Sequence, residues 1–257
     1  MEHPWPWLDG APKVNGVYRL GPPGPVSERY ANARARENRL LSDEQVRILP
    51  TGRGLWNVSE WTVRAQGAAR LRNLLRPATD GLRILEVGCG NGWLSALLQR
   101  DGHKVLGLDP FTDEVEQAAR VFTGGPAFAI GEFLTTTMNV AVFDVVLFPA
   151  SIQYFEDLEA VITKAISLLR PGGTIHVLDS VLYSSVAHAL AAKQRSAAYF
   201  TRIGVPEMTE HYHCHSLEVF NTLGHVQVLH RPIARWHWTR LLGSPATPFT
   251  HLTIAPR

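Results

Sequence analysis

The spacing of hydrophobic and polar residues changes near residue 82. Before this point, residues 27–49 look helical, with Arg and Glu scattered among them, and residues 57–75 place apolar side chains at helical intervals. After it, short apolar runs of strand length alternate with segments that have one apolar face. This alternation predicts an α/β fold in which helices cover both faces of a mostly parallel sheet. The predicted strands are 82–87, 104–108, 126–130, 143–148, 174–178, 226–228 and 252–254, and the predicted helices are 93–100, 112–122, 158–169 and 185–202.

The residues before 82 carry two further local signals. The first 25 residues hold six of the 17 prolines, and proline fixes φ and lacks an amide donor. We expect an extended arm there, held by Trp5, Trp7 and Tyr18, with a frayed terminus as the alternative. Asn57 to Glu60 has the form of a capping box, which predicts that the second helix begins at Asn57.

Length and composition narrow the class of protein. A chain of 257 residues corresponds to about 1.7 average domains, which fits one full α/β domain with extra segments. The net charge of +2 gives no strongly basic face, so we expect no nucleic-acid partner. Two cysteines, Cys89 and Cys214, cannot build a disulfide framework. With no apolar run of about 20 residues and no signal-peptide pattern, we expect no membrane insertion and a cytoplasmic location.

The segment from Glu86 to Trp93 is the most informative in the chain. A buried strand runs into glycines at positions 88, 90 and 92 and then into a helix. Glycines at this point allow a ligand to approach backbone amides closely. Asp109 ends the next strand, where an acid binds the hydroxyls of a ribose. These features together predict a cofactor that contains adenosine.

The spacing of the glycines indicates which cofactor. A dinucleotide-binding loop needs a small residue at the position that Trp93 occupies, so a nicotinamide-dependent oxidoreductase is disfavoured. The acid at the end of the strand, Glu86, suits an ammonium group and repels a pyrophosphate. A ligand with a ribose and a positively charged amino-acid tail fits both observations, and S-adenosylmethionine is such a ligand.

Four motifs in order resemble those of class I S-adenosylmethionine-dependent methyltransferases. Residues 84–92 look like the first motif of that family, and residues 105–109 are similar to the second. Residues 143–148 resemble the fourth strand, and residues 168–173 the turn before the fifth. The resemblance is greatest to small-molecule methyltransferases related to quinone-biosynthesis enzymes. It implies a Rossmann-like sheet of seven strands in the order 3-2-1-4-5-7-6, with strand 7 antiparallel, in residues 80–257. Residues 1–79 then form an N-terminal arm and helical cap.

The resemblance also implies the residues that bind the cofactor. Glu86 would hold the methionine ammonium, and Asp109 both ribose hydroxyls. The remaining contacts implied for the methionine, the ribose, the adenine and the sulfonium are Gly88, Cys89, Gly90, Asn91, Pro110, Phe111, Gly131, Glu132, Phe133, Phe148 and Ala150. From its place on the first long helix, Arg64 is a candidate partner for the methionine carboxylate, with a solvated surface position as the alternative.

Residues for catalysis are less clearly marked. Methyl transfer from a sulfonium needs alignment and exclusion of water, and a base only where the acceptor loses a proton. Tyr154 follows the fourth strand and is a candidate acid, base or pocket wall. In the run 211–215, three histidines would share one face if the segment were a strand, and we expect them to serve the acceptor pocket rather than a metal. His213 is the candidate base of that cluster.

The sequence therefore predicts a methyltransferase that acts on a small, partly apolar acceptor. A cofactor-binding regulatory domain without catalysis is an alternative, as is the nicotinamide-dependent oxidoreductase. The acceptor, the methylated atom and the oligomeric state stay open.

Overall fold

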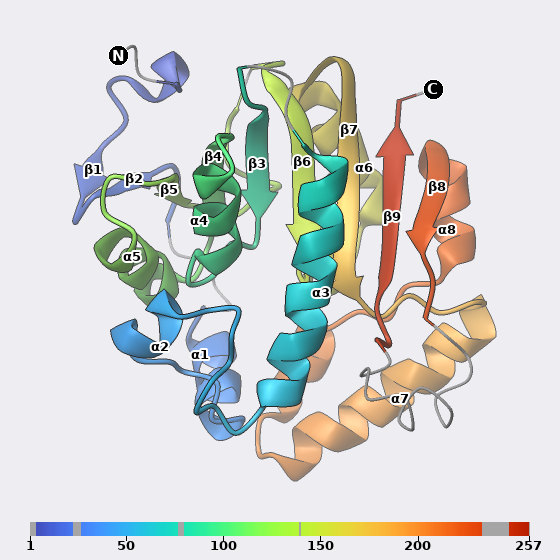
Figure 1. Cartoon of the computed structure of the whole chain (residues 1–257). Helices are drawn as coiled ribbons and strands as arrows, with labels where there is room; N and C mark the ends of the chain where they lie inside the picture. The colour runs from blue at the N-terminus through green and yellow to red at the C-terminus, as the bar shows by residue number, and fades with distance from the viewer. Residues whose placement is uncertain (1–3, 23–26, 77–79, 139, 233–246, 257) are drawn as a thin grey trace.

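The computed structural model describes residues 4–22, 27–76, 80–138, 140–232 and 247–256 (Figure 1). Residues 1–3 and 23–25 of the predicted arm lie outside these ranges. The described residues form one nine-stranded sheet in the order β1-β2-β5-β4-β3-β6-β7-β9-β8. The strands are β1 Lys13–Val14, β2 Val17–Arg19, β3 Arg83–Val87, β4 Lys104–Asp109, β5 Ala127–Ile130, β6 Phe143–Pro149, β7 Leu169–Ser180, β8 His225–His230 and β9 Thr250–Ala255.

The described helices lie on both faces of the sheet and at one of its ends (Figure 1). The longer helices are α1 Ser27–Arg36, α3 Val58–Leu74, α4 Trp93–Arg100, α5 Thr112–Val121, α6 Leu158–Leu168 and α7 Val186–Arg202. The shorter ones are α2 Asp43–Arg47, α8 Leu217–Leu223 and the 3-10 helices η1 Pro6–Leu8, η2 Ile152–Tyr154 and η3 Pro206–His211. Helices α3, α4 and α5 cover one face, and α6 and α8 the other.

The sheet is of the α/β type that the alternation predicts. Strands β5, β4, β3, β6 and β7 are parallel to one another. Strand β9 is antiparallel to both β7 and β8. Numbered along the chain from β3, these seven strands lie in the order 3-2-1-4-5-7-6. The sheet has two more strands than expected, because β2 pairs in parallel with β5 and β1 pairs with β2.

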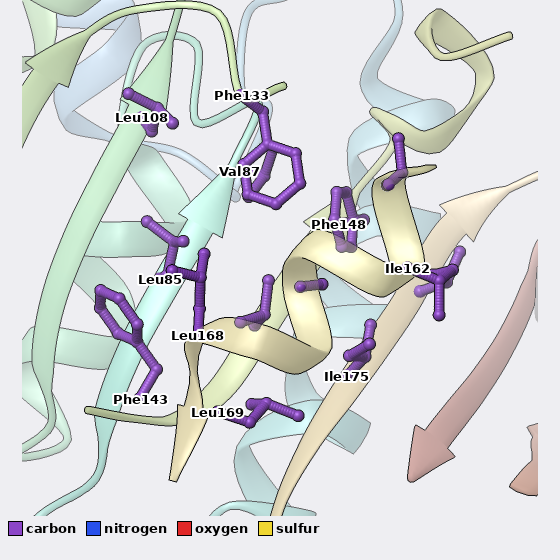
Figure 2. Packing of buried hydrophobic residues seen from close by; sticks show 14 of the residues in the cluster. Leu85, Val87, Leu108, Phe133, Phe143, Phe148, Ile162, Leu168, Leu169 and Ile175 are labelled. Carbon is purple, nitrogen blue, oxygen red and sulfur yellow. The ribbon is translucent and has the colours of Figure 1, made fainter. Parts of the chain in front are cut away.

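Both faces of the central strands are buried, because successive side chains on a strand point to opposite faces. On β3, Ile84 packs beneath α3 and α4, whereas Leu85 and Val87 belong to the core beneath α6. Figure 2 shows that second core, with Phe143 and Phe148 of β6 among the α6 side chains. The central strands therefore read as continuous apolar runs and end together at one edge.

Residues 4–22 contain more regular structure than the proline content predicts. Trp5, beside the 3-10 helix η1, is only 1% exposed, and its ring lies 5.3 Å from that of Phe143. Tyr18 is buried on β2. The prolines do not disrupt these elements. Strand β2 contains no proline, and Pro6 lies at the first position of η1, where no amide donor is needed.

Two expectations for the N-terminal segment are wrong, namely one helix over residues 27–49 and a capping box at Asn57. The predicted start of the next helix at Asn57 is confirmed, since Asn57 is the N-cap of α3. Residues 27–49 form two helices rather than one, because the chain turns at Asn38, whose φ is +54°. The capping box is made by Ser42 and Gln45 at the start of α2. At Asn57 the side chain makes no cap, since its amide donates to Glu60 instead (3.4 Å).

The predicted boundary at residue 79 divides parts that share a core. Ala68, Leu71 and Leu75 of α3 and its C-cap pack against Leu94 and Leu98 of α4. The same segment therefore covers the sheet with its second half and reaches past the sheet's edge with its first half. Among the described residues, no helix is both long and apolar enough to cross a membrane.

We predict that Trp5→Ala lowers the free energy of unfolding by about 3–5 kcal/mol, because a large buried ring is replaced by a cavity. Urea denaturation measures this change. The matched control is Trp56→Ala. The Trp56 ring is 61% exposed, so its loss should cost about 1 kcal/mol or less. Equal effects of the two changes would contradict the assignment of Trp5 to the core.

Candidate active site

Two adjoining cavities lie at the carboxyl ends of β3, β4, β6 and β7. One, here called the apolar cavity, has a volume of about 530 Å³ and lies along the ends of β3 and β4. The other, here called the charged cavity, has a volume of about 250 Å³ and lies between the sheet edge and helices α1 and α3. Both are lined by Tyr30, Gly88, Gly90, Ala150 and Tyr154, so they form a continuous site.

The glycine loop after β3 is shaped by its packing. Gly88 and Gly92 have φ values of +80° and +73°, in the left-handed region. A Cβ on Gly88 would lie 2.4 Å from Cβ of Ser151, and one on Gly92 would lie 2.6 Å from the ring of Phe128. Positions 88 and 92 therefore require glycine. Without side chains in the way, the backbone of Gly88 and Gly90 lines both cavities.

Asp109 joins the end of β4 to the glycine loop. Its carboxylate accepts hydrogen bonds from the amides of Gly90 (2.9 Å) and Phe111 (2.8 Å). Burial raises the pKa of Asp109 to about 7 although these amides favour the charged form. The carboxylate lines the apolar cavity beside Pro110 and Phe111, where it can accept further hydrogen bonds.

Glu86 is the corresponding acid of the charged cavity. It is 2% exposed and accepts a hydrogen bond from the hydroxyl of Ser95 on α4. Burial raises its pKa to about 8, against the effect of that hydrogen bond. A cationic ligand would reverse this shift by stabilising the carboxylate.

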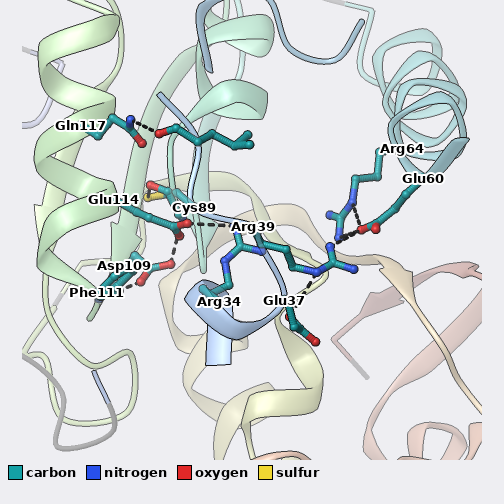
Figure 3. A network of polar contacts seen from close by, with 12 residues as sticks. Arg34, Glu37, Arg39, Glu60, Arg64, Cys89, Asp109, Phe111, Glu114 and Gln117 are labelled. Atoms are coloured by element: carbon teal, nitrogen blue, oxygen red, sulfur yellow. Dashed lines mark hydrogen bonds and ion pairs between the residues drawn. The ribbon is translucent and has the colours of Figure 1, made fainter. Parts of the chain in front are cut away.

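Ion pairs made by side chains of α1, of α3 and of the loop after α1 line the charged cavity, and Figure 3 shows these side chains. Arg34 of α1 pairs with Glu114 of α5 at 2.9 Å. Glu60 of α3 accepts from both Arg39 (2.8 Å) and Arg64 (3.0 Å). Burial acts to raise the pKa of Glu60, but the two guanidiniums hold it at about 2. The Arg34–Glu114 pair joins the N-terminal segment to α5, whereas the pairs of Glu60 hold parts of that segment together.

A row of aromatic rings forms the wall between the two cavities. Tyr30 contacts Phe111 on one side and Tyr154 on the other, with ring centroids 5.4 and 5.6 Å apart. Tyr154 in turn contacts Tyr212 at 5.9 Å. Desolvation raises the pKa of Tyr154 above its ordinary value, so the phenol is a proton donor near neutral pH rather than a ready base.

Most of the residues expected to bind a cofactor come together here. Those in the charged cavity are Arg64, Glu86, Cys89 and Asn91; those in the apolar cavity are Asp109, Pro110, Phe111, Gly131, Glu132 and Phe133; and those in both are Gly88, Gly90 and Ala150. The Cys89 side chain packs in the small core beneath α5. Trp93 lies edge to face with Trp61 of α3, at 5.7 Å.

Phe148 is a correction to the expected set. It lines neither cavity, is fully buried and contacts Phe133 (5.6 Å) and Phe155 (6.0 Å) in the core on the other face (Figure 2). Side chains alternate along β6, so Phe148 points away from the site, and the residues that follow it, Pro149 and Ala150, reach the site instead.

The histidine run also differs from the expectation. Residues 212–215 are not a strand, and His211 belongs to the 3-10 helix η3, so the three histidines do not line up along one strand. His211 lines the apolar cavity, Tyr212 lines the charged cavity, and His213 lines neither. The His213 amide donates to the carbonyl of Gln153 (2.7 Å), which fixes the backbone and leaves the ring stacked on His215. In the described ranges, no three His, Cys, Asp or Glu residues are arranged to hold a metal ion.

The sequence analysis missed several residues of the charged cavity. They are Tyr30, Arg34, Glu37, Arg39, Glu60, Glu114, Gln153, Asp179 and Tyr212. Asp179 could have been found, because it ends a parallel strand as Asp109 does. The others come from segments whose position over the sheet depends on tertiary packing.

The chain is similar to methyltransferases in sequence and in fold. Residues 85–177 match the methyltransferase domain family. The chain is 32% identical over 142 residues to the ubiquinone biosynthesis O-methyltransferase of Xanthomonas campestris pv. campestris (strain B100), which covers 53% of this chain and 57% of that protein. A second such enzyme, from Mesorhizobium japonicum, is 31% identical over 121 residues and covers 45% of this chain and 48% of that protein. The chain thus spans about half the length of these curated relatives.

Among solved structures, the geranyl diphosphate C-methyltransferase from Streptomyces coelicolor A3(2) has the same fold. The TM-score is 0.61 at 13% identity, and the match covers 91% of this chain and 98% of that one. Residues 85–177 thus resemble a methyltransferase domain in sequence, and the chain shares the fold of a solved methyltransferase.

We predict that Glu86→Gln stabilises the cofactor-free protein at high pH. The folded pKa of Glu86 is raised to about 8, so above that pH the folded state holds a buried charge that the unfolded state does not. The gain should reach up to about 4 kcal/mol near pH 9 and decline as the pH falls through 8 towards the unfolded value. Urea denaturation at several pH values measures it.

The control for this prediction is Glu159→Gln on α6, where the side chain is exposed. It should change the free energy of unfolding little, and equally at every pH. A Glu86→Gln variant that is less stable than the parent at pH 9 would show that the carboxylate is not desolvated.

Proposed function

We propose that the protein transfers a methyl group from S-adenosylmethionine to a small acceptor. The observation that carries this proposal is the placement of Asp109 and Glu86 at the ends of neighbouring strands, each facing one of two joined cavities. A cofactor with a nucleoside at one end and an ammonium group at the other fits that placement. The methyl acceptor would occupy the part of the charged cavity beneath α1 and α3.

The apolar cavity suits the adenosine. In the proposal Asp109 accepts from both ribose hydroxyls, while Pro110 and Phe111 lie against the adenine face. Gly131, Glu132 and Phe133 meet the adenine edge. The carboxylate of Asp109 is already oriented by two amides, so little reorganisation is needed when the hydroxyls bind.

The charged cavity suits the amino-acid end. Glu86 holds the ammonium, and Gly88, Gly90 and Asn91 line the chain of atoms between it and the ribose. Arg64 is the residue that the sequence suggests as the partner of the methionine carboxylate. Arg34 is a second candidate, because its partner Glu114 lies against Gly90: a Cβ there would be 3.0 Å from the Glu114 carboxylate. Either arginine must share its guanidinium between the cofactor and its present acid.

The protein's part in the reaction follows from these positions. S-adenosylmethionine supplies a methyl group that is already activated on a sulfonium. Ala150, Tyr30 and Tyr154, at the junction of the cavities, fix the line along which an acceptor approaches. The ion pairs of α1 and α3 keep water out. We propose Tyr154 as a wall and hydrogen-bond donor; His213 would act only through Gln153 or Tyr212, since its ring is outside both cavities.

We predict that S-adenosylhomocysteine binds with a micromolar dissociation constant, about 8 kcal/mol, in isothermal titration calorimetry. Asp109→Ala should weaken binding at least about tenfold, since each hydrogen bond to a charged group contributes about 1.5–3 kcal/mol. Asp113→Ala, an exposed acid on α5, is the control and should bind as the parent does. Heat with NADH and none with S-adenosylhomocysteine would favour an oxidoreductase and refute the proposal.

We also predict that the cofactor product slows hydrogen exchange in residues 27–76, because this segment lines the charged cavity. Helix α6, on the opposite face of the sheet, should be unaffected. Protection confined to residues 84–133 would show that the N-terminal segment takes no part in binding.

A further inference from the structure

Asp179 occupies the end of β7 and lines the charged cavity. It is 6% exposed. Its φ of +53° places it in the left-handed region, which is uncommon for a residue other than glycine. The buried carboxylate of Asp179 thus faces the charged cavity.

The other four acids of this cavity have partners. Glu37 accepts from Tyr199 and Arg39, and Glu60 from Arg39 and Arg64. Glu86 accepts from Ser95, and Glu114 from Arg34. In the part of the chain that the structure describes, no hydrogen bond or ion pair reaches the carboxylate of Asp179. Buried polar groups are normally satisfied, and the described residues offer this one no donor, so a ligand in the cavity is a candidate partner.

Helix α3 leaves room for this carboxylate. Gly67 lies in the interior of α3, where glycine is unfavourable, and a Cβ there would be 2.6 Å from Oδ1 of Asp179. The charged groups nearest to it are all on α3. Arg64 and Arg70 favour its ionised form and Glu60 opposes it, yet burial outweighs the arginines and raises the pKa to about 6. At neutral pH the group is therefore charged and buried, and it has no hydrogen-bond donor among the residues that the structure describes.

The charge of the cavity indicates what kind of donor it takes. Five acids and three arginines line it, so the cavity has an excess of two negative charges once Glu86 is ionised, as a bound ammonium group would favour. S-adenosylmethionine carries two positive groups and one negative group, so its binding would leave one negative charge. Aromatic rings of Tyr30, Trp61, Tyr154 and Tyr212 line the same cavity, and ring faces attract cations.

We propose that Asp179 binds a protonated amine on the methyl acceptor, and that the acceptors of this protein are cationic small molecules with an aromatic or apolar body. This inference rests on the proposed function, since the acceptor must share the cavity with the cofactor. Asp179 is a specificity-determining residue in this assignment: it selects and orients the acceptor, and the amine need not be the atom that is methylated.

Three probes with the same ring test the assignment: 2-phenylethylamine, 2-phenylethanol and phenylacetate. Each is titrated by calorimetry at about pH 8, where Asp179 is ionised, into protein saturated with S-adenosylhomocysteine. We expect the amine to bind at millimolar concentration and more tightly than the alcohol, and phenylacetate to bind least. Tighter binding of phenylacetate, or no binding of the amine at millimolar concentration, would overturn the proposal.

Variants separate the carboxylate from the rest of the cavity. Asp179→Asn should lose at least about tenfold in amine affinity while its affinity for S-adenosylhomocysteine stays unchanged, which also shows that it is folded. Gly67→Ala should reduce amine binding as well, because its methyl group displaces the carboxylate. Asp113→Asn removes the same charge from the exposed face of α5 and should change nothing. Equal amine affinity in Asp179→Asn and the parent would refute the assignment.

Failure of the proposed function gives a different result. If S-adenosylhomocysteine itself does not bind, the methyltransferase proposal is at fault. If it binds normally and the amine preference is absent, only the role of Asp179 is wrong.

Discussion

Several carboxylates are buried together at the carboxyl edge of the sheet, and the rest of the site depends on that constraint. A parallel sheet brings the ends of β3, β4 and β7 to one edge, and each of these strands places an acid there: Glu86, Asp109 and Asp179. Burial raises the pKa of all three. The protein stabilises them only in part, through one hydroxyl and two amides, so the cofactor-free site holds unfavourable charge that suitable ligands would relieve.

The N-terminal segment maintains this burial. It joins the sheet through β1 and β2, lines the charged cavity with α1 and returns to the sheet in α3. The arginines of this segment that line the charged cavity form ion pairs with Glu37, Glu60 and Glu114. They form none with the three acids at the strand ends. The segment thus excludes water from those acids without neutralising them, which keeps them available to ligands.

The sequence predicted the parts of the structure that local pattern controls. Helix α4 has the predicted bounds 93–100, and the central strands differ from their predicted bounds by few residues, because their apolar runs and glycine boundaries are strong local signals. Strand β2 was missed because it is stabilised by pairing with β5, which is far away in the sequence. Phe148 was misplaced because alternation along β6 is not visible in a strand that is apolar on both faces. His213 was misplaced because a strand was assumed where the chain is irregular. The acids and arginines of the charged cavity come from five separate segments, and no spacing within the sequence relates them.

The parallel pairing of β2 with β5 has a consequence for how the protein comes to be folded. Tyr18 is matched with Ala129, about 110 residues later, so β2 can pair with β5 only after that length of chain has been made. Contacts of such high sequence separation form late, since their loop-closure entropy must be met by the sheet core first. The core from β3 to β5 can assemble as soon as it is synthesised, and the N-terminal segment then docks on a finished edge. The charged cavity is therefore enclosed late, because α1 and α3 lie over a sheet edge that must form before them.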